Sequence, residues 1–144
     1  MTKKGFTLIE MLVALFIIIV LLAIGIPQYG KMKANSELNL AADQLAAELR
    51  YTRQTAISQG SSSINLNAPP QGYTIGYTVY NSNGGQLKSQ GLNSITISYP
   101  GNGTITFSSN GSTDIGGNIV LTSTNTGRQR TIAITQVSGM IVLK

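Results

Sequence analysis

The chain opens with an apolar stretch at residues 6–26, in which only Thr7 and Glu10 are polar. A helix rises about 1.5 Å per residue, so about 21 residues form a helix about 30 Å long. That length matches the hydrocarbon core of a bilayer. The pattern therefore predicts a membrane-spanning helix at residues 6–27.

A second helical pattern, amphipathic this time, follows Pro27. Because proline removes one backbone hydrogen bond, we expect Pro27 to bend the helix rather than end it. The amphipathic half should occupy residues 28–60, running to about Ser58 with Gly60 as its stop. Its apolar or small side chains recur at spacings of three and four, which places them on one face; they are Leu38, Ala41, Ala42, Leu45, Leu49, Thr52 and Ala56.

Beyond Gly60 the pattern becomes alternating, which is typical of strands. The segments are short, β-branched or aromatic, and bounded by turn residues at 83–85, 100–103, 110–111 and 138–139. Residues 61–144 therefore predict a β-rich head, and the chain as a whole predicts an α+β fold with one long helix packed on antiparallel sheets. The expected strands are residues 62–66, 73–80, 94–99, 104–108, 118–124, 130–136 and 140–143.

Composition restricts the chemistry. The 144 residues include no Cys and no His, and the formal net charge is +5. A disulfide framework is excluded, and the commonest transition-metal ligands are missing, so we expect no metal and no cofactor. Only 10% of residues are charged, so the polar surface of the head must be built mainly from uncharged side chains. Such a surface fits an extracytoplasmic domain.

Glu10 is the informative residue of the apolar stretch. A carboxylate costs about 2.5–3.5 kcal/mol near the centre of a membrane helix, less towards an end, and such residues usually serve a function. The nearest cations are Lys3 and Lys4. A cut after Gly5 would remove both lysines and leave a new amino terminus on Phe6. The Glu10 carboxylate could then pair with the terminal amine of a neighbouring subunit.

Residues 3–13, Lys-Lys-Gly-Phe-Thr-Leu-Ile-Glu-Met-Leu-Val, resemble the leader and start of type IV pilins and type II secretion pseudopilins. The resemblance implies that a prepilin peptidase cleaves after Gly5, methylates Phe6 and so removes the leader, residues 1–5. It also implies that Glu10 is the assembly carboxylate and that Pro27 bends the helix. Lysines are equally frequent on the two sides of the span and leave its orientation open, whereas the resemblance places the leader in the cytoplasm.

Two other interpretations of the N-terminus remain. A secretory signal peptide would use Lys3 and Lys4 as its basic region and residues 23–25 as its cleavage site. A plain single-span anchor carrying a binding module would leave the cost of Glu10 unexplained. N-terminal sequencing separates an uncleaved anchor from a pilin, because a processed pilin would start at Phe6.

Later features resemble the GspH/FimT branch of minor pilins and pseudopilins. The helix carries a segment rich in Leu, Arg and Ala at residues 45–56, and the chain closes on a glycine-led strand at residues 139–143. This resemblance implies a filament subunit with an extracytoplasmic head. Its partners would be the cytoplasmic (inner) membrane, the prepilin peptidase and other pilin or pseudopilin subunits, in a pilus or pseudopilus at the cell surface or in the periplasm.

The segment at residues 126–130, Thr-Gly-Arg-Gln-Arg, is the candidate for nucleic-acid contact. Arg128 and Arg130 are two positions apart, so an extended strand directs both to one face. Guanidinium groups bind phosphates bidentately. The Gly-Arg-x-Arg pattern resembles the motif by which FimT-type minor pilins contact DNA in natural transformation, which implies that Gly127 shapes the loop. Lys144 and Lys88 are outlying candidates for the same patch.

The alternative for the two arginines is that they are solvated charges at a strand edge, where they discourage edge pairing. Catalysis finds no support, since Asp114 is the only acid after Glu48. One carboxylate also favours a polar loop over a calcium site. We therefore expect a non-enzymatic minor pilin that contacts double-stranded DNA without sequence preference. A type II secretion minor pseudopilin that does not bind DNA is the alternative.

Overall fold

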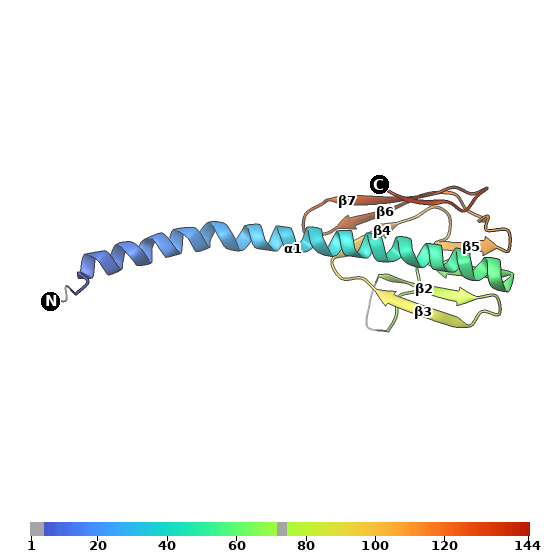
Figure 1. Cartoon of the computed structure of the whole chain (residues 1–144), viewed down its shortest axis with the longest axis horizontal. Coiled ribbons are helices and arrows are strands. Elements are labelled where there is room, and N and C mark those ends of the chain that lie inside the picture. The colour runs from blue at the N-terminus through green and yellow to red at the C-terminus, as the bar shows by residue number, and fades with distance from the viewer. Residues whose placement is uncertain (1–4, 72–74) are drawn as a thin grey trace. The chain divides into compact units, whose positions relative to one another are not determined.

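The computed structural model describes residues 5–71 and 75–144 (Figure 1). The chain divides into two compact units, Met1–Lys33 and Ala34–Lys144. Helix α1 (Leu8–Gln59) belongs to both, and the strands belong to the second unit, which we call the head. The strands are β1 (Ser61–Asn65), β2 (Gly76–Asn81), β3 (Gln86–Gly91), β4 (Ile95–Ser98), β5 (Thr104–Ser108), β6 (Gly117–Ser123), β7 (Gln129–Ile134) and β8 (Ile141–Leu143).

Helix α1 begins with a capping box formed by Thr7 and Glu10. The Thr7 backbone N–H donates to Glu10 Oε2 at 3.2 Å, and the Glu10 backbone N–H donates to Thr7 Oγ1 at 3.3 Å. This reciprocal pair satisfies two of the amide groups that a helix start leaves unpaired. The helix continues through Pro27, as expected, and ends at Gln59. Gly60 follows with a φ of +98°, the left-handed conformation of a glycine stop.

The apolar half of α1 buries none of its large side chains. Every large apolar side chain in residues 6–26 is exposed, with Phe6 exposed by 82%. By length and composition alone, this part of α1 is apolar enough to cross a membrane, with a mean hydropathy of 3.1 over its most apolar window. The apolar surface of residues 6–26 therefore has no partner in its own unit.

The head consists of two four-stranded antiparallel sheets packed on α1. Their strand orders are β3-β2-β1-β5 and β4-β6-β7-β8. Figure 1 shows β2 and β3 on one side of α1 and β6 and β7 on the other. All seven residues of the helix face expected from the sequence are at most 4% exposed. They pack in one core with inward residues of both sheets, among them Ile64, Val79 and Phe107 of the first and Ile119, Leu121 and Ile132 of the second.

The expectation of seven strands was wrong at one place, because β3 was missed. Its residues, Gln-Leu-Lys-Ser-Gln-Gly, include no β-branched or aromatic side chain. The hairpin from β2 forms β3 instead: Asn81 Oδ1 accepts the backbone N–H groups of Asn83 at 3.1 Å and Gly85 at 2.7 Å. The first residues of the expected strand 73–80 lie outside the described residues, and β2 begins at Gly76.

Candidate assembly and nucleic-acid interfaces

At the start of α1, the Glu10 carboxylate accepts local hydrogen bonds from Thr7. Thr7 Oγ1 donates to Glu10 Oε2 at 3.3 Å, in addition to the backbone donor of the capping box. Within residues 5–71 and 75–144 no basic side chain pairs with Glu10, and Lys3 and Lys4 lie outside the described residues. The sequence contained this signal, because Thr7 and Glu10 have capping-box spacing. The capping hydrogen bonds therefore offset part of the free-energy cost of placing the Glu10 carboxylate in an apolar helix. They supply no positive charge to neutralise it.

The hairpin between β6 and β7 presents the arginine segment. The Gly127 N–H donates to the Ser123 carbonyl at 2.8 Å, and the Ser123 N–H donates to the Arg128 carbonyl at 2.9 Å. Gly127 has a φ of +69°, and a Cβ there would meet only open space. Backbone conformation, rather than close packing, thus requires glycine in this turn. Thr126 Oγ1 donates to Asn35 Oδ1 at 3.1 Å, which ties the hairpin to α1.

Arg128 and Arg130 belong to the face of β7 that packs on the helix. Arg130 lies opposite Leu121 in the strand register, and Arg128 follows the same alternation opposite Ser123. Leu121 is fully buried and Ser123 is 1% exposed. The structure therefore places both arginines at the end of the inner face, where Arg128 is exposed and Arg130 is half-buried. Arg130 Nε is buried and has no hydrogen-bond partner among the described residues.

The strand-edge alternative for these arginines depends on how far β8 extends along β7. β7 is an interior strand, paired with β6 on one side and β8 on the other. The edges of this sheet are β4 and β8. β8 pairs with β7 only at residues 132–134, and the Thr131 backbone bonds to that of Lys144. Among the described residues, Arg128 and Arg130 therefore lie beyond the part of β7 that β8 covers, and the strand-edge alternative stays open.

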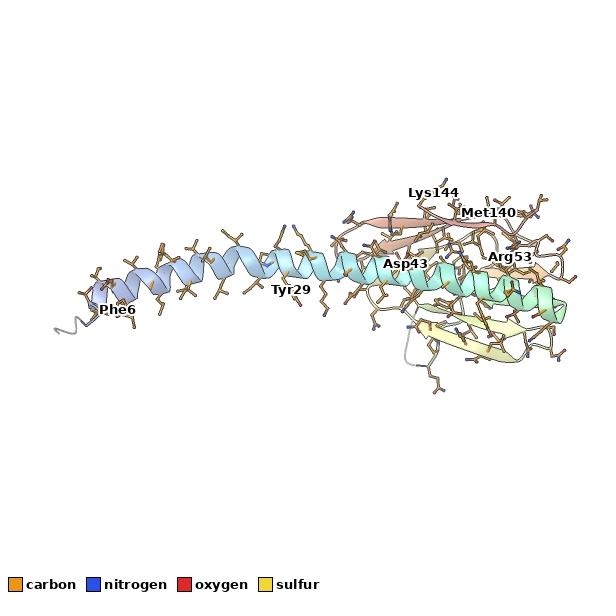
Figure 2. The ribbon with its side chains drawn as sticks, viewed as in Figure 1. Phe6, Tyr29, Asp43, Arg53, Met140 and Lys144 are labelled. Carbon is orange, nitrogen blue, oxygen red and sulfur yellow. The ribbon has the colours of Figure 1, made fainter. Side chains whose placement is uncertain are left out.

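The two outlying lysines have different positions. The Lys144 backbone exchanges two hydrogen bonds with Thr131, at 2.8 and 3.2 Å, so it lies beside Arg130 in the sheet. Because Thr131 and Arg130 are adjacent, Lys144 belongs to the opposite, outer face; Figure 2 shows its side chain pointing away from α1. Lys88 is in β3, in the other sheet, and its Nζ lies 3.0 Å from Glu48 Oε1. The structure therefore does not bring Lys88 together with the arginines.

A partly exposed polar cluster surrounds Glu48 in the head. Lys88 Nζ also lies 4.8 Å from the centroid of the Tyr51 ring, a cation–π contact. Burial, and secondarily the negative charge of Glu48, raises the pKa of Tyr77 to about 12. Glu48 Oε2 is buried without a hydrogen-bond partner in the described part of the chain. This cluster joins α1 to the sheet that contains β3.

Arg53 has a structural role that its position in the helix pattern did not indicate. Its Nε donates to the Gly111 carbonyl at 3.1 Å, and Gly139, with a φ of +58°, packs against both groups. Figure 2 shows Arg53 on the same side of the head as Met140. Arg53 therefore holds the β5–β6 and β7–β8 turns to the end of α1. Because Gly111 is 58 residues away along the chain and Gly139 is farther still, no local pattern in the sequence predicts the contacts.

Asp114 also has a structural role. Its Oδ1 accepts the Thr106 backbone N–H at 2.8 Å and a long hydrogen bond from Thr113 Oγ1 at 3.3 Å. Among the described residues, no three His, Cys, Asp or Glu side chains cluster as they would around a metal ion. The polar-loop interpretation of this region agrees with these contacts.

Comparison with known proteins decides the family. Residues 41–138 match the family described as Type II transport protein GspH, and residues 1–26 match the prokaryotic N-terminal methylation motif. The chain belongs to the GspH family of type IV pilin-like proteins. The N-terminal match, together with the apolar part of α1, fits a membrane-anchored pilin that is part of a surface or periplasmic pilus.

Curated relatives of this GspH-family chain include fimbrial proteins. It is 36% identical over 89 residues to a fimbrial protein of Pseudomonas aeruginosa, which covers 61% of this chain and 57% of the relative. It is 31% identical over 101 residues to the type IV major fimbrial protein FimA of Dichelobacter nodosus, with 70% and 58% covered. The chain thus spans less than three fifths of the length of these relatives.

Solved structures confirm the fold of the GspH-family chain. The crystal structure of the type IV minor pilin FimU of Pseudomonas aeruginosa matches with a TM-score of 0.61 and 25% identity, covering 76% of this chain and 90% of that one. A second crystal form of FimU gives 0.58 and 24%, which supports the fold alone. The expected architecture of one long helix on antiparallel sheets is therefore that of a type IV pilin.

Proposed function

We propose that the protein is a minor type IV pilin that is cleaved after Gly5, methylated on Phe6 and assembled from the cytoplasmic membrane into a pilus. The observation that carries this proposal is the exposed apolar half of α1 beside a head with a complete core of its own. A helix that is apolar all round needs lipid or other helices as partners. Lipid would cover residues 6–26 before assembly, and the helices of other pilin subunits would cover them in the filament. The role is structural rather than enzymatic.

Glu10 would set the register between subunits. Its carboxylate has local hydrogen bonds but no countercharge in the described residues. The amine of Phe6 in a neighbouring processed subunit would supply that charge within the apolar bundle. The match of residues 1–26 to the methylation motif supports processing at this position.

Replacement of Glu10 tests the assembly proposal. Glu10→Ala should be processed and remain in the membrane, while its incorporation into filaments falls about tenfold or more, because a buried ion pair loses one partner at a cost of about 3–5 kcal/mol. The matched control is Asp43→Ala, which removes an exposed acid from the same helix. Immunoblots of sheared filaments and membranes, with N-terminal sequencing, give the measurement. Normal incorporation of Glu10→Ala would contradict the proposal.

A second proposal concerns double-stranded DNA, which the arginine hairpin would bind without sequence preference during natural transformation. Arg128 is exposed, and no described residue forms an ion pair with either arginine. Gly127 would let the hairpin approach the phosphate backbone, and Lys144 lies at the same end of the sheet. A minor pseudopilin of a type II secretion system, with no DNA contact, is the competing function and draws support from the GspH family.

A salt titration separates the two functions. The full processed chain in detergent is titrated with a short duplex at several salt concentrations, alone and as Arg128→Ala and Arg130→Ala. Removal of an arginine that neutralises one phosphate should lower the slope of log K against log salt by about 0.9. Arg50→Ala, which removes an exposed arginine of α1, is the control. Equal and negligible retention of DNA by all forms would remove DNA uptake, favour the secretion pseudopilin and leave the pilin proposal standing.

A further inference from the structure

Ser123 and Arg130 each hold a buried polar atom that has no partner. Ser123 Oγ and Arg130 Nε are both inaccessible to solvent, and neither forms a hydrogen bond within the described residues. Ser123 ends β6, and Arg130 is the second residue of β7. An unpaired buried hydroxyl and an unpaired guanidinium N–H thus occur on adjacent strands.

The strand register makes these two residues neighbours on one face. Arg130 lies opposite Leu121, two residues before Ser123 in β6, so Ser123 is its diagonal neighbour. Diagonal positions in an antiparallel pair have Cβ atoms about 7 Å apart, which is within reach of a long side chain. A change of the Arg130 rotamer would therefore let Nε–H donate to Ser123 Oγ.

Stability alone gives no reason for a serine at this position. A buried hydroxyl without a partner costs about 1–3 kcal/mol, and an apolar residue of similar size removes that cost. Arg130 Nε is likewise buried and unpaired, so a ligand can engage the guanidinium bidentately only through its other edge, Nη1 and Nη2. A guanidinium presents two bidentate edges, and burial of Nε blocks one of them.

We propose that Ser123 is the positioning residue of the phosphate contact, a role that rests on the DNA contact proposed above. In the complex Ser123 Oγ accepts from Arg130 Nε–H, and this bond fixes the guanidinium with Nη1 and Nη2 directed outward. Arg130 then engages a phosphate end-on and bidentately. Arg128, which is exposed at the end of the same face, supplies a second phosphate contact. No neighbouring side chain fixes its orientation in the proposed complex.

The test compares Ser123→Ala and Ser123→Thr with the unmodified full chain in detergent, in the same duplex titration. Ser123→Ala should weaken binding about three- to tenfold, the effect of removing one hydrogen bond, while leaving the salt slope unchanged because every phosphate contact remains. Ser123→Thr keeps the hydroxyl and should restore most of the affinity. Ser98→Ala, an exposed serine of the neighbouring strand β4, is the matched control.

Two further measurements distinguish positioning from a structural effect. Ser123→Ala should unfold at an equal or higher temperature, because it removes an unpaired hydroxyl. The NMR signal of Arg130 Nε–H should shift downfield, as a newly formed hydrogen bond requires, when DNA is added to the unmodified chain, and should not shift in Ser123→Ala. If Arg130→Ala weakens binding but Ser123→Ala matches the unmodified chain, the positioning role is overturned and the DNA proposal stands. If the unmodified chain retains no DNA, both are overturned.

Discussion

Leu12 and Leu45 are the same residue in the same helix, and they have opposite surroundings. Leu12 is 56% exposed, whereas Leu45 is fully buried in the core of the head. Both residues lie within the continuous helix α1. What differs is the neighbour: the two sheets cover one face of residues 34–59, whereas no described residue of the first unit buries the large side chains of residues 6–26. The exposed apolar half is the part of the chain that fits the membrane-anchored pilin of this family.

The composition of the two halves agrees with this division. In the head, Ala41, Ala42 and Ala46 are at most 4% exposed and let the backbone of α1 approach the sheets closely. In residues 6–26 large aliphatic side chains occur all round the helix, as in membrane spans and helix bundles. The first half therefore has the composition of a helix that meets lipid or other helices, and the second half packs in the core of the head.

The sharpest test of this division is a pair of identical substitutions. Leu45→Ala should lower the free energy of unfolding of the head by about 2–5 kcal/mol, because it leaves a cavity in a packed core. Leu12→Ala should leave that free energy unchanged, since Leu12 contributes nothing to the core. Urea unfolding of both variants in detergent, followed by near-ultraviolet circular dichroism of the head, gives the values. A comparable loss of stability from Leu12→Ala would contradict the claim that the apolar half contributes nothing to the core of the head.

Glycine substitutions should rank next in effect. Gly139→Ala combines a φ of +58° with a clash of its Cβ against the Gly111 carbonyl and Arg53, so it should cost about 3 kcal/mol or more. Gly127→Ala shares the left-handed conformation but has open space, so it should cost about 1–2 kcal/mol. Gly30→Ala, helical and uncrowded in the apolar unit, should be neutral or slightly stabilising. Thermal unfolding of the three variants checks the order, and equal effects at Gly139 and Gly127 would show that the packing around Arg53 is unimportant.

Sequence reasoning recovered the parts of the fold that local physics decides. The buried face around Leu45 and the stop at Gly60 follow from spacing and from glycine conformation. β3 was missed because its pairing with β2, and not its own side chains, makes it a strand. The burial of Ser123 and Arg130 was equally inaccessible, since it depends on which strand lies beside β7. At Glu10, the spacing from Thr7 is itself the sequence signal for the capping box.

The raised pKa of Tyr77 predicts a loss of stability in alkali. Its ordinary pKa of 10.0 is raised to about 12 by burial and then by Glu48. Between pH 10 and 12 the unfolded chain loses the phenol proton while the folded head keeps it, so stability falls as pH rises through this range. Tyr77→Phe should flatten the decline. Denaturant midpoints across pH 8–12 give the comparison, and parallel curves for Tyr77→Phe and the unmodified chain would contradict the assignment.

The smallest expected effect concerns Glu48, a carboxylate on the same helix as Glu10. Glu48 has its cation within the chain, because Lys88 Nζ lies 3.0 Å away, whereas Glu10 has none among the described residues. Lys88 is 54% exposed and Glu48 is 19% exposed, so Lys88→Met should cost only about 0.5–1 kcal/mol and less at high salt. Lys88→Met with Glu48→Gln should recover part of that stability, since the unpaired charge is then gone. A double-mutant cycle by urea unfolding measures the coupling. A coupling of zero would mean that Glu48 is tolerated without its partner, and an uncompensated carboxylate at Glu10 would then be weaker evidence for contact with another subunit.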